Sequence, residues 1–136
     1  MDLATSMMVA ASGMRAQSTR MRTIAEIIAN ANSTSNTPGG DPYRRKIATM
    51  TSDFDNELNA TMVHAGTPVQ DMSDFHLQYD PGNPNADKQG YIKLPNVNSL
   101  VEIMDMREAQ KSYEANLNVL DASKTMMSRT VDLLRQ

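Results

Sequence analysis

Residues 3–31 read LATSMMVAASGMRAQSTRMRTIAEIIANA, and residues 103–134 carry a second stretch of the same kind. In both stretches apolar side chains recur in alternating steps of four and three residues, which is the pattern of helices that pack along a seam. The first stripe comprises Leu3, Met7, Ala10, Met14, Gln17, Met21, Ile24, Ile28 and Ala31. The second comprises Ile103, Met106, Gln110, Tyr113, Leu117, Leu120, Lys124, Met127, Val131 and Leu134. A chain with such a stripe near each end is suited to pairing helices, within itself or with copies of itself. This pattern indicates assembly rather than catalysis.

Polar side chains interrupt both stripes at Gln17, Gln110 and Lys124. A buried polar residue at a seam position lowers stability but penalises wrong registers, because few alignments satisfy its hydrogen bonds. Alternatively, these positions face water as the stripe drifts around a straight helix. Both interpretations stay open at this point.

The apolar periodicity predicts a mainly α fold with a small β insert. We expect one helix over residues 2–31 and a second over 99–135, because neither stretch contains proline. Residues 75–79 and 91–94 alternate apolar and polar side chains, which predicts two short strands joined by the turn-rich segment 80–85. Residues 50–62 fit either a strand or a short amphipathic helix. The expected organisation is one helical assembly domain, 1–32 with 99–136, in which the terminal helices pair as a coiled-coil-like layer, and a β-containing insert, 33–98.

Two local signals refine the helices. Gly13 is the only interior glycine of the first helix, and we interpret it, with its small neighbours Ala11 and Ser12, as a notch for close packing. Asn98 or Ser99 is the expected N-cap of the second helix, and Ser99 with Glu102 has the spacing of a capping box.

Composition excludes several classes of protein. The 136 residues have a net charge of −3, which gives no electrostatic basis for binding nucleic acid. The only basic run, residues 44–46, is interpreted as a solvated surface patch. No apolar run approaches the roughly 18 residues of a membrane helix. Asp2 and the absence of a positive n-region predict no cleaved signal peptide. Aromatic residues make up only 4% and methionine occurs twelve times, which favours an adaptable seam over a thick core.

No catalytic or metal-binding constellation emerges. The only histidines, His64 and His76, have no partner at helical metal-ligand spacing. Residues 53–57 resemble the start of a calcium loop, but Leu58 occupies its glycine position and His64 its last acidic position. There is no cysteine. We therefore expect no cofactor and no enzyme activity, against the alternative of a hydrolase that uses His64 or His76.

These residues also carry a family resemblance. Residues 11–17 (ASGMRAQ), 24–26 (IAE), 29–34 (ANANST) and 42–46 (PYRRK) resemble the rod and hook family of axial proteins in the bacterial flagellum. Residues 79–84 (YDPGNP), 86–87, 90–91, 95–98 (PNVN), 102–106 (EIMDM), Ala109 and 113–116 (YEAN) are most similar to its proximal-rod branch. The motif residues we single out are Gly13, Asn30, Asn32, Tyr43, Arg44, Tyr113 and Asn116. Ile27 stands where the family commonly has asparagine, and residues 47–74 match no motif.

The resemblance implies a structural subunit of the basal-body rod that assembles through its terminal helices into a helical tube. It implies export through the flagellum's own apparatus without a cleaved signal, and a periplasmic position. The implied partners are other copies, neighbouring rod proteins, and the membrane-embedded base and export apparatus. The alternative from another class is a soluble helical hairpin that acts as an adaptor or chaperone-like binding module.

Overall fold

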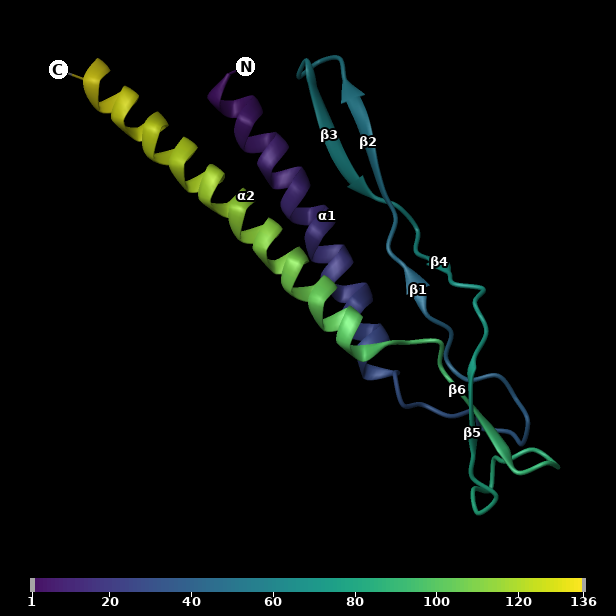
Figure 1. The fold of residues 1–136 in the computed structure, drawn as a ribbon. Helices are drawn as coiled ribbons and strands as arrows, with labels where there is room; N and C mark the ends of the chain where they lie inside the picture. The colour runs from purple at the N-terminus through teal and green to yellow at the C-terminus, as the bar shows by residue number, and fades with distance from the viewer. Residues whose placement is uncertain (1, 136) are drawn as a thin grey trace. The chain divides into compact units, whose positions relative to one another are not determined.

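The computed structural model describes residues 2–135. Along the chain, one long helix precedes and another follows a strand-containing middle region (Figure 1). The elements follow one another as α1 (Leu3–Ala29), β1 (Lys46–Ile47), β2 (Met50–Asp55), β3 (Ala60–Ala65), β4 (Val69–Gln70), β5 (His76–Tyr79), β6 (Tyr91–Leu94) and α2 (Ser99–Leu134). The expected fold class, mainly helical with a small β insert, is confirmed.

Both helices lie where the apolar periodicity predicts them, and side-chain hydrogen bonds define their ends. The Asn30 Nδ2 donates to the Glu26 carbonyl, 2.8 Å away, where α1 ends. At the start of α2, Asn98 Oδ1 accepts hydrogen bonds from the backbone N–H groups of Leu100 and Val101, at 3.1 and 3.4 Å. Asn98 is therefore the N-cap. The Glu102 side chain pairs elsewhere, as described below, rather than completing a capping box.

The strands form three separate antiparallel pairs. One pair joins the two strands predicted near residues 75–79 and 91–94. These are β5 and β6, with Tyr79 opposite Tyr91. Residues 50–62 contain strand rather than helix. The strands β2 and β3 pair with Met50 opposite Ala65 at one end and Asp55 opposite Ala60 at the other. The two-residue pair β1–β4 was not predicted, because two residues are too few to show a period.

The chain divides into two compact units, each of which is described separately. The first unit comprises residues 1–21, 49–67 and 107–136, and the second comprises 22–48 and 68–106. The first unit thus holds most of α1, the hairpin β2–β3 and most of α2. The second holds the end of α1, the pairs β1–β4 and β5–β6, and the first turns of α2.

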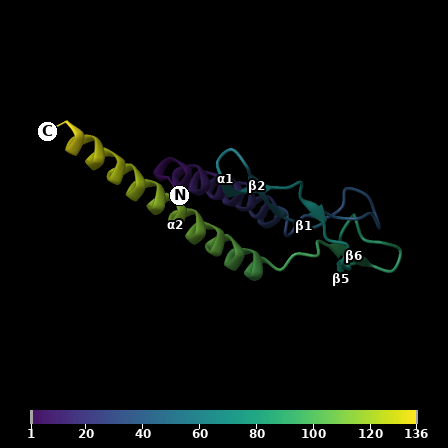
Figure 2. The same cartoon turned by 90° about the horizontal axis from the view of Figure 1, so that it is seen from above.

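Within the first unit, α1 lies between α2 and the hairpin (Figures 1 and 2). Ser12 joins α1 to the hairpin: its buried hydroxyl donates to the Val9 carbonyl at 2.7 Å and accepts from the Val63 N–H at 3.2 Å. Because this N–H points away from β2, α1 covers the outer edge of β3. Ala60 and Met62 of β3 are buried, whereas β2 is exposed over nearly its whole length.

In the second unit, Asp87 organises the long connection between β5 and β6. Its Oδ1 accepts hydrogen bonds from the backbone N–H groups of Tyr91 and Gln89, at 2.9 and 2.8 Å. These bonds, with that of the Gly90 N–H, lower the pKa of Asp87. Gly90 has φ of 84°, which glycine adopts without strain, and the rings of Tyr79 and Tyr91 meet edge to face at 5.2 Å.

Candidate assembly surface

The contact between α1 and α2 in the first unit is built from small and polar side chains. A Cβ on Gly13 would fall 2.8 Å from Asn116 Nδ2, so glycine permits this close approach, as the predicted notch requires. Ala109 and Ser123, each seven residues from Asn116, are buried on the same face of α2. Further along, Arg20 Nη2 lies 3.4 Å from Glu108 Oε2. Small and polar side chains therefore make the closest approach between these two helices.

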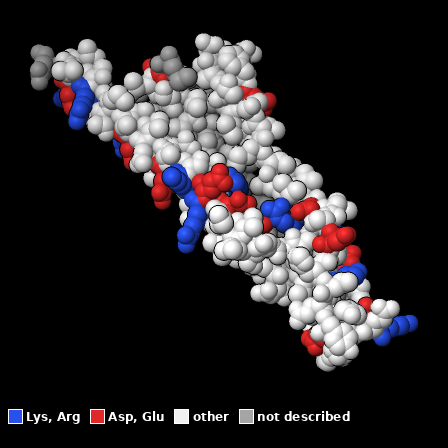
Figure 3. All heavy atoms as spheres, in the orientation of Figure 1, with Lys and Arg blue, Asp and Glu red and all other residues white. Residues whose placement is uncertain are grey.

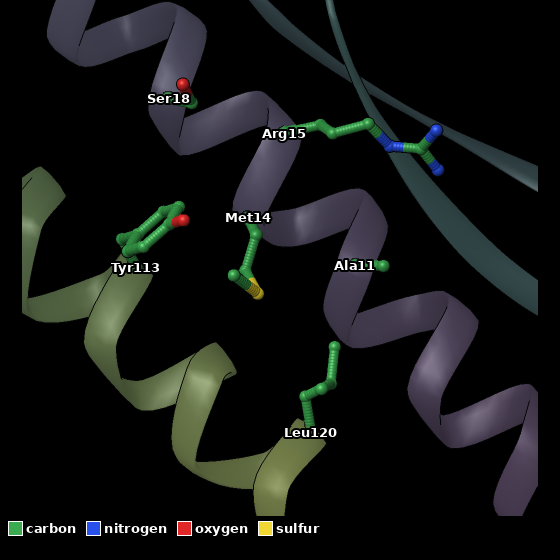
Figure 4. A pocket seen from close by; sticks show the side chains of 6 residues that line it. All are labelled: Ala11, Met14, Arg15, Ser18, Tyr113 and Leu120. Carbon is green, nitrogen blue, oxygen red and sulfur yellow. The ribbon is translucent and has the colours of Figure 1, made fainter.

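Apolar residues of the two predicted stripes instead line a groove along one side of this contact. One part, of about 370 Å³, is lined by Ala4, Met7, Met8, Ala11, Leu120 and Met127. An adjoining part, of about 470 Å³, is lined by Ala11, Met14, Arg15, Ser18, Tyr113 and Leu120. Figure 4 shows Met14 pointing from α1 toward α2, between Tyr113 and Leu120. The structure thus brings Met7, Met14, Tyr113, Leu120 and Met127 together on one surface.

A smaller groove of about 220 Å³ follows the opposite side of the contact. It is lined by Ser6, Val9, Ala10, Asn116 and Val119. Ala10, a stripe residue, is buried here, whereas Val119 remains exposed. The α1–α2 pair therefore presents a groove on both of its sides.

Four other apolar residues of the second stripe are exposed, as are its polar members Gln110 and Lys124: the apolar four are Ile103, Leu117, Val131 and Leu134. The antiparallel register explains two of them. With Gly13 opposite Asn116 and Met127 beside Ala4, the helix turns that carry Val131 and Leu134 pass beyond the start of α1. Val131 is 50% and Leu134 82% exposed. The end of α2 therefore carries apolar side chains that no element within residues 2–135 covers.

The remaining apolar stripe residues are more enclosed. Ile24 is buried, and its neighbour Ile27 is only 1% exposed. Those that are half-buried are Leu3, Met21, Ile28 and Met106.

The motif residues of the second unit make defined polar contacts. Tyr43 donates its hydroxyl to Glu26 Oε1 at 3.4 Å. Burial, then the Glu26 charge and hydrogen bond, raise the pKa of Tyr43 to about 12. Arg44 donates to the carbonyl oxygens of Asp71 and Ser73, both at 3.1 Å, and its guanidinium lies 4.2 Å from the Phe75 ring centroid. Asn32 is exposed.

A buried ion pair is the functional feature that the sequence analysis missed. Arg45 Nε donates to Glu102 Oε1 at 2.6 Å, and the Glu102 side chain is only 2% exposed. Burial alone would lower the pKa of Arg45, but the hydrogen bond and charge of Glu102 outweigh it and raise the pKa. Asn96 joins the cluster by accepting from the Arg45 N–H and donating to the Asp71 carbonyl.

The interpretation of residues 44–46 as a solvated patch was therefore wrong. Arg44 and Arg45 are both engaged as described, and Lys46 Nζ lies 2.6 Å from Glu26 Oε1. Glu26 and Glu102 are far from residue 46 in sequence, so no local pattern reveals these pairs. The motif ties the end of α1, the strand β1 and the start of α2 together within the second unit.

Within residues 2–135, no three histidine, aspartate or glutamate side chains gather as a metal site requires. Neither helix, over the part that is described, has the length of apolar sequence needed to cross a bilayer.

Comparisons with known proteins identify the family to which the chain belongs. Residues 88–133 match the family described as flagellar basal body rod FlgEFG protein C-terminal. The chain is 49% identical over 127 residues to the flagellar basal-body rod protein FlgC of Agrobacterium fabrum, covering 93% of this chain and 91% of that protein. The FlgC proteins of Aquifex aeolicus and Salmonella typhimurium are 36% and 37% identical, covering 97% and 92% of both chains respectively. The chain therefore belongs to the FlgC family of flagellar basal-body rod proteins, which are structural components of the flagellum.

Proposed function

We propose that this chain is a non-enzymatic subunit of the proximal rod, which self-assembles through its terminal helices into a helical tubular drive shaft. The observation that carries the proposal is the mismatch between the two sets of side chains on α2. Small residues of α2 such as Ala109 are fully buried, while large ones such as Leu117 and Val131 stay partly exposed. Completing the burial of such a partly exposed side chain between copies would contribute roughly 1 kcal/mol.

The terminal helices would form the assembly domain, residues 1–32 with 99–136, in a coiled-coil-like layer around the rod axis. Residues 33–98 would form the insert. The grooves beside the α1–α2 contact and the uncovered end of α2 are different surfaces, and each would meet a neighbour. Contacts between different surfaces generate an open helical filament when the rotation from copy to copy does not close into a ring, as the proposed rod requires.

Location and partners follow from the same proposal. The chain would leave the cytoplasm through the flagellar export apparatus without cleavage of a signal, and would reach the periplasmic rod. It would contact other copies, neighbouring rod proteins and the membrane-embedded base, and it would need no cofactor. Mass spectrometry of the chain from isolated basal bodies tests the export step: an N-terminus at Met1 or Asp2 is expected, and a shortened N-terminus would contradict it.

Charge substitution at exposed seam positions tests the assembly step. Leu117→Asp and Val131→Asp should leave the helicity of the dilute chain unchanged, because both side chains are already exposed, yet remove the chain from isolated basal bodies. Met72→Asp is the matched control, since Met72 is 76% exposed outside the helices. Normal rods containing both seam variants would refute the assignment of the seam.

The adaptor alternative instead predicts a small oligomer whose sedimentation does not change with concentration.

A further inference from the structure

Besides the two grooves beside the α1–α2 contact, the first unit has a more polar cavity between α1 and β3. It has a volume of about 300 Å³ and is lined by Arg15, Ala16, Thr19, Val63, His64 and Ala65. Figure 4 shows the Arg15 side chain extending away from Tyr113, toward the strands. Arg15 and His64 are both exposed, and neither forms an ion pair with a carboxylate of residues 2–135. A cation in a polar cavity without a carboxylate is suited to an anionic group from outside.

The hairpin β2–β3 carries the complementary charge. Asp53, Asp55 and Glu57 fall within five residues at its turn, and residues 49–67 contain no lysine or arginine. Asp53 and Glu57 are exposed, and Asp55 is half-buried. None of the three takes part in an ion pair within the described part of the chain. Figure 3 shows acidic atoms along β2 and no basic atoms beside them on this face.

The turn of a given chain is too far away to fill the cavity of the same chain. Asp55 lies opposite Ala60, and His64 is four residues further along β3. At about 3.3 Å per residue, roughly 13 Å of strand separates the two positions. Glu57 lies beyond Asp55 in the turn, so it is no closer. Asp55 and Glu57 can therefore reach such a cavity only in another molecule.

We propose that the cavity beside Arg15 and His64 receives the acidic hairpin turn of a second copy. This inference rests on the proposed function, because it names one contact between assembled subunits. The guanidinium of Arg15 would hold a carboxylate of Asp55 or Glu57 through paired N–H donors, and the imidazole of His64 would donate to the same group. Cavity and turn are different surfaces, so each copy can receive one turn and supply another, and the contact can repeat along a filament.

The absence of cysteine allows a direct test by disulfide cross-linking. Asn56→Cys places a thiol in the turn, and Ala65→Cys places one at the cavity, without removing any charged group. Within one chain these positions are separated by more than the roughly 7 Å that a disulfide spans between Cα atoms. In basal bodies that contain the double-cysteine chain, oxidation should give a ladder of linked copies, which neither single-cysteine variant gives.

Charge reversal then tests the chemistry of the contact. Arg15→Glu should lower the linked product by at least about tenfold, because it places like charges together. Adding Glu57→Lys in the same chain should restore much of the linked product, because it reverses a turn charge and leaves intact the hydrogen bonds that Asp55 accepts from the backbone of Glu57 and Leu58. Lys88→Glu, an equal charge change on an exposed residue of the second unit, is the control and should leave the product unchanged.

Three results would overturn the inference: rods that contain the double-cysteine chain but no linked copies, equal linkage with Arg15→Glu, or linkage to a different protein. A chain without added cysteines that never enters basal bodies would instead count against the proposed function. The two failures are therefore distinguishable.

Discussion

Asn116 of α2 lies against the backbone of Gly13 of α1, so closely that a Cβ on residue 13 would stand 2.8 Å from its Nδ2 and 3.2 Å from its Cγ. The two residues are 103 positions apart in sequence. Their contact sets the register of the helices in the first unit and determines which side chains of α2 remain exposed.

A double-mutant cycle measures this contact. Gly13→Ala alone should stabilise by less than the roughly 1 kcal/mol gained in helix propensity, because the amide of Asn116 must move aside to make room for the new Cβ. In an Asn116→Ala background, which removes the clash, the same change should stabilise by about 1 kcal/mol. Urea unfolding followed by far-UV circular dichroism gives both values. Equal effects of Gly13→Ala in the two backgrounds would show that the helices do not approach at this point.

The Arg45–Glu102 pair predicts an asymmetric response to mutation. Arg45→Met would leave the Glu102 carboxylate buried without its partner and should cost about 3 kcal/mol of unfolding free energy. Glu102→Gln removes the buried charge and should cost about 1–2 kcal/mol, because Arg45 is partly exposed and water can solvate it. Unfolding in urea checks this order, with Lys88→Met as control. A larger loss for Glu102→Gln would contradict the burial of that carboxylate.

The hydrogen bonds to Asp87 predict acid sensitivity of the β5–β6 connection. The backbone N–H groups of Tyr91 and Gln89 lower the pKa of Asp87 below the ordinary 3.8. Its contribution to stability is therefore complete above pH 3.8 and is lost as the pH falls through the lowered pKa. Hydrogen exchange of residues 80–91 should accelerate in that range, after correction for the intrinsic pH dependence of exchange. Asp87→Asn should flatten this response, whereas Asp74→Asn, at an exposed residue of the same unit, should not.

Sequence patterns predict the elements of this fold better than their contacts. The long periodic stripes correctly predict both helices, and Gly13 correctly predicts a close approach. The face of α2 that meets α1 is missed, because Ala109, Asn116 and Ser123 are small or polar and give no hydropathy signal. The Arg45–Glu102 pair is missed because 57 residues separate its members. Contacts of this kind depend on the assembled fold and leave no local periodicity.

Oxidation of Met127 by hydrogen peroxide tests the central claim most directly. Met127 is 41% exposed in the single chain, at the end of the groove with Met7 and Met8. Peroxide should therefore convert it readily to the sulfoxide in the dilute chain. In assembled rods we predict that its oxidation slows by at least about tenfold, because a neighbouring copy excludes solvent from the seam. An oxidation rate for Met127 that is the same in rods and in the dilute chain would contradict the claim that these helices assemble through this surface.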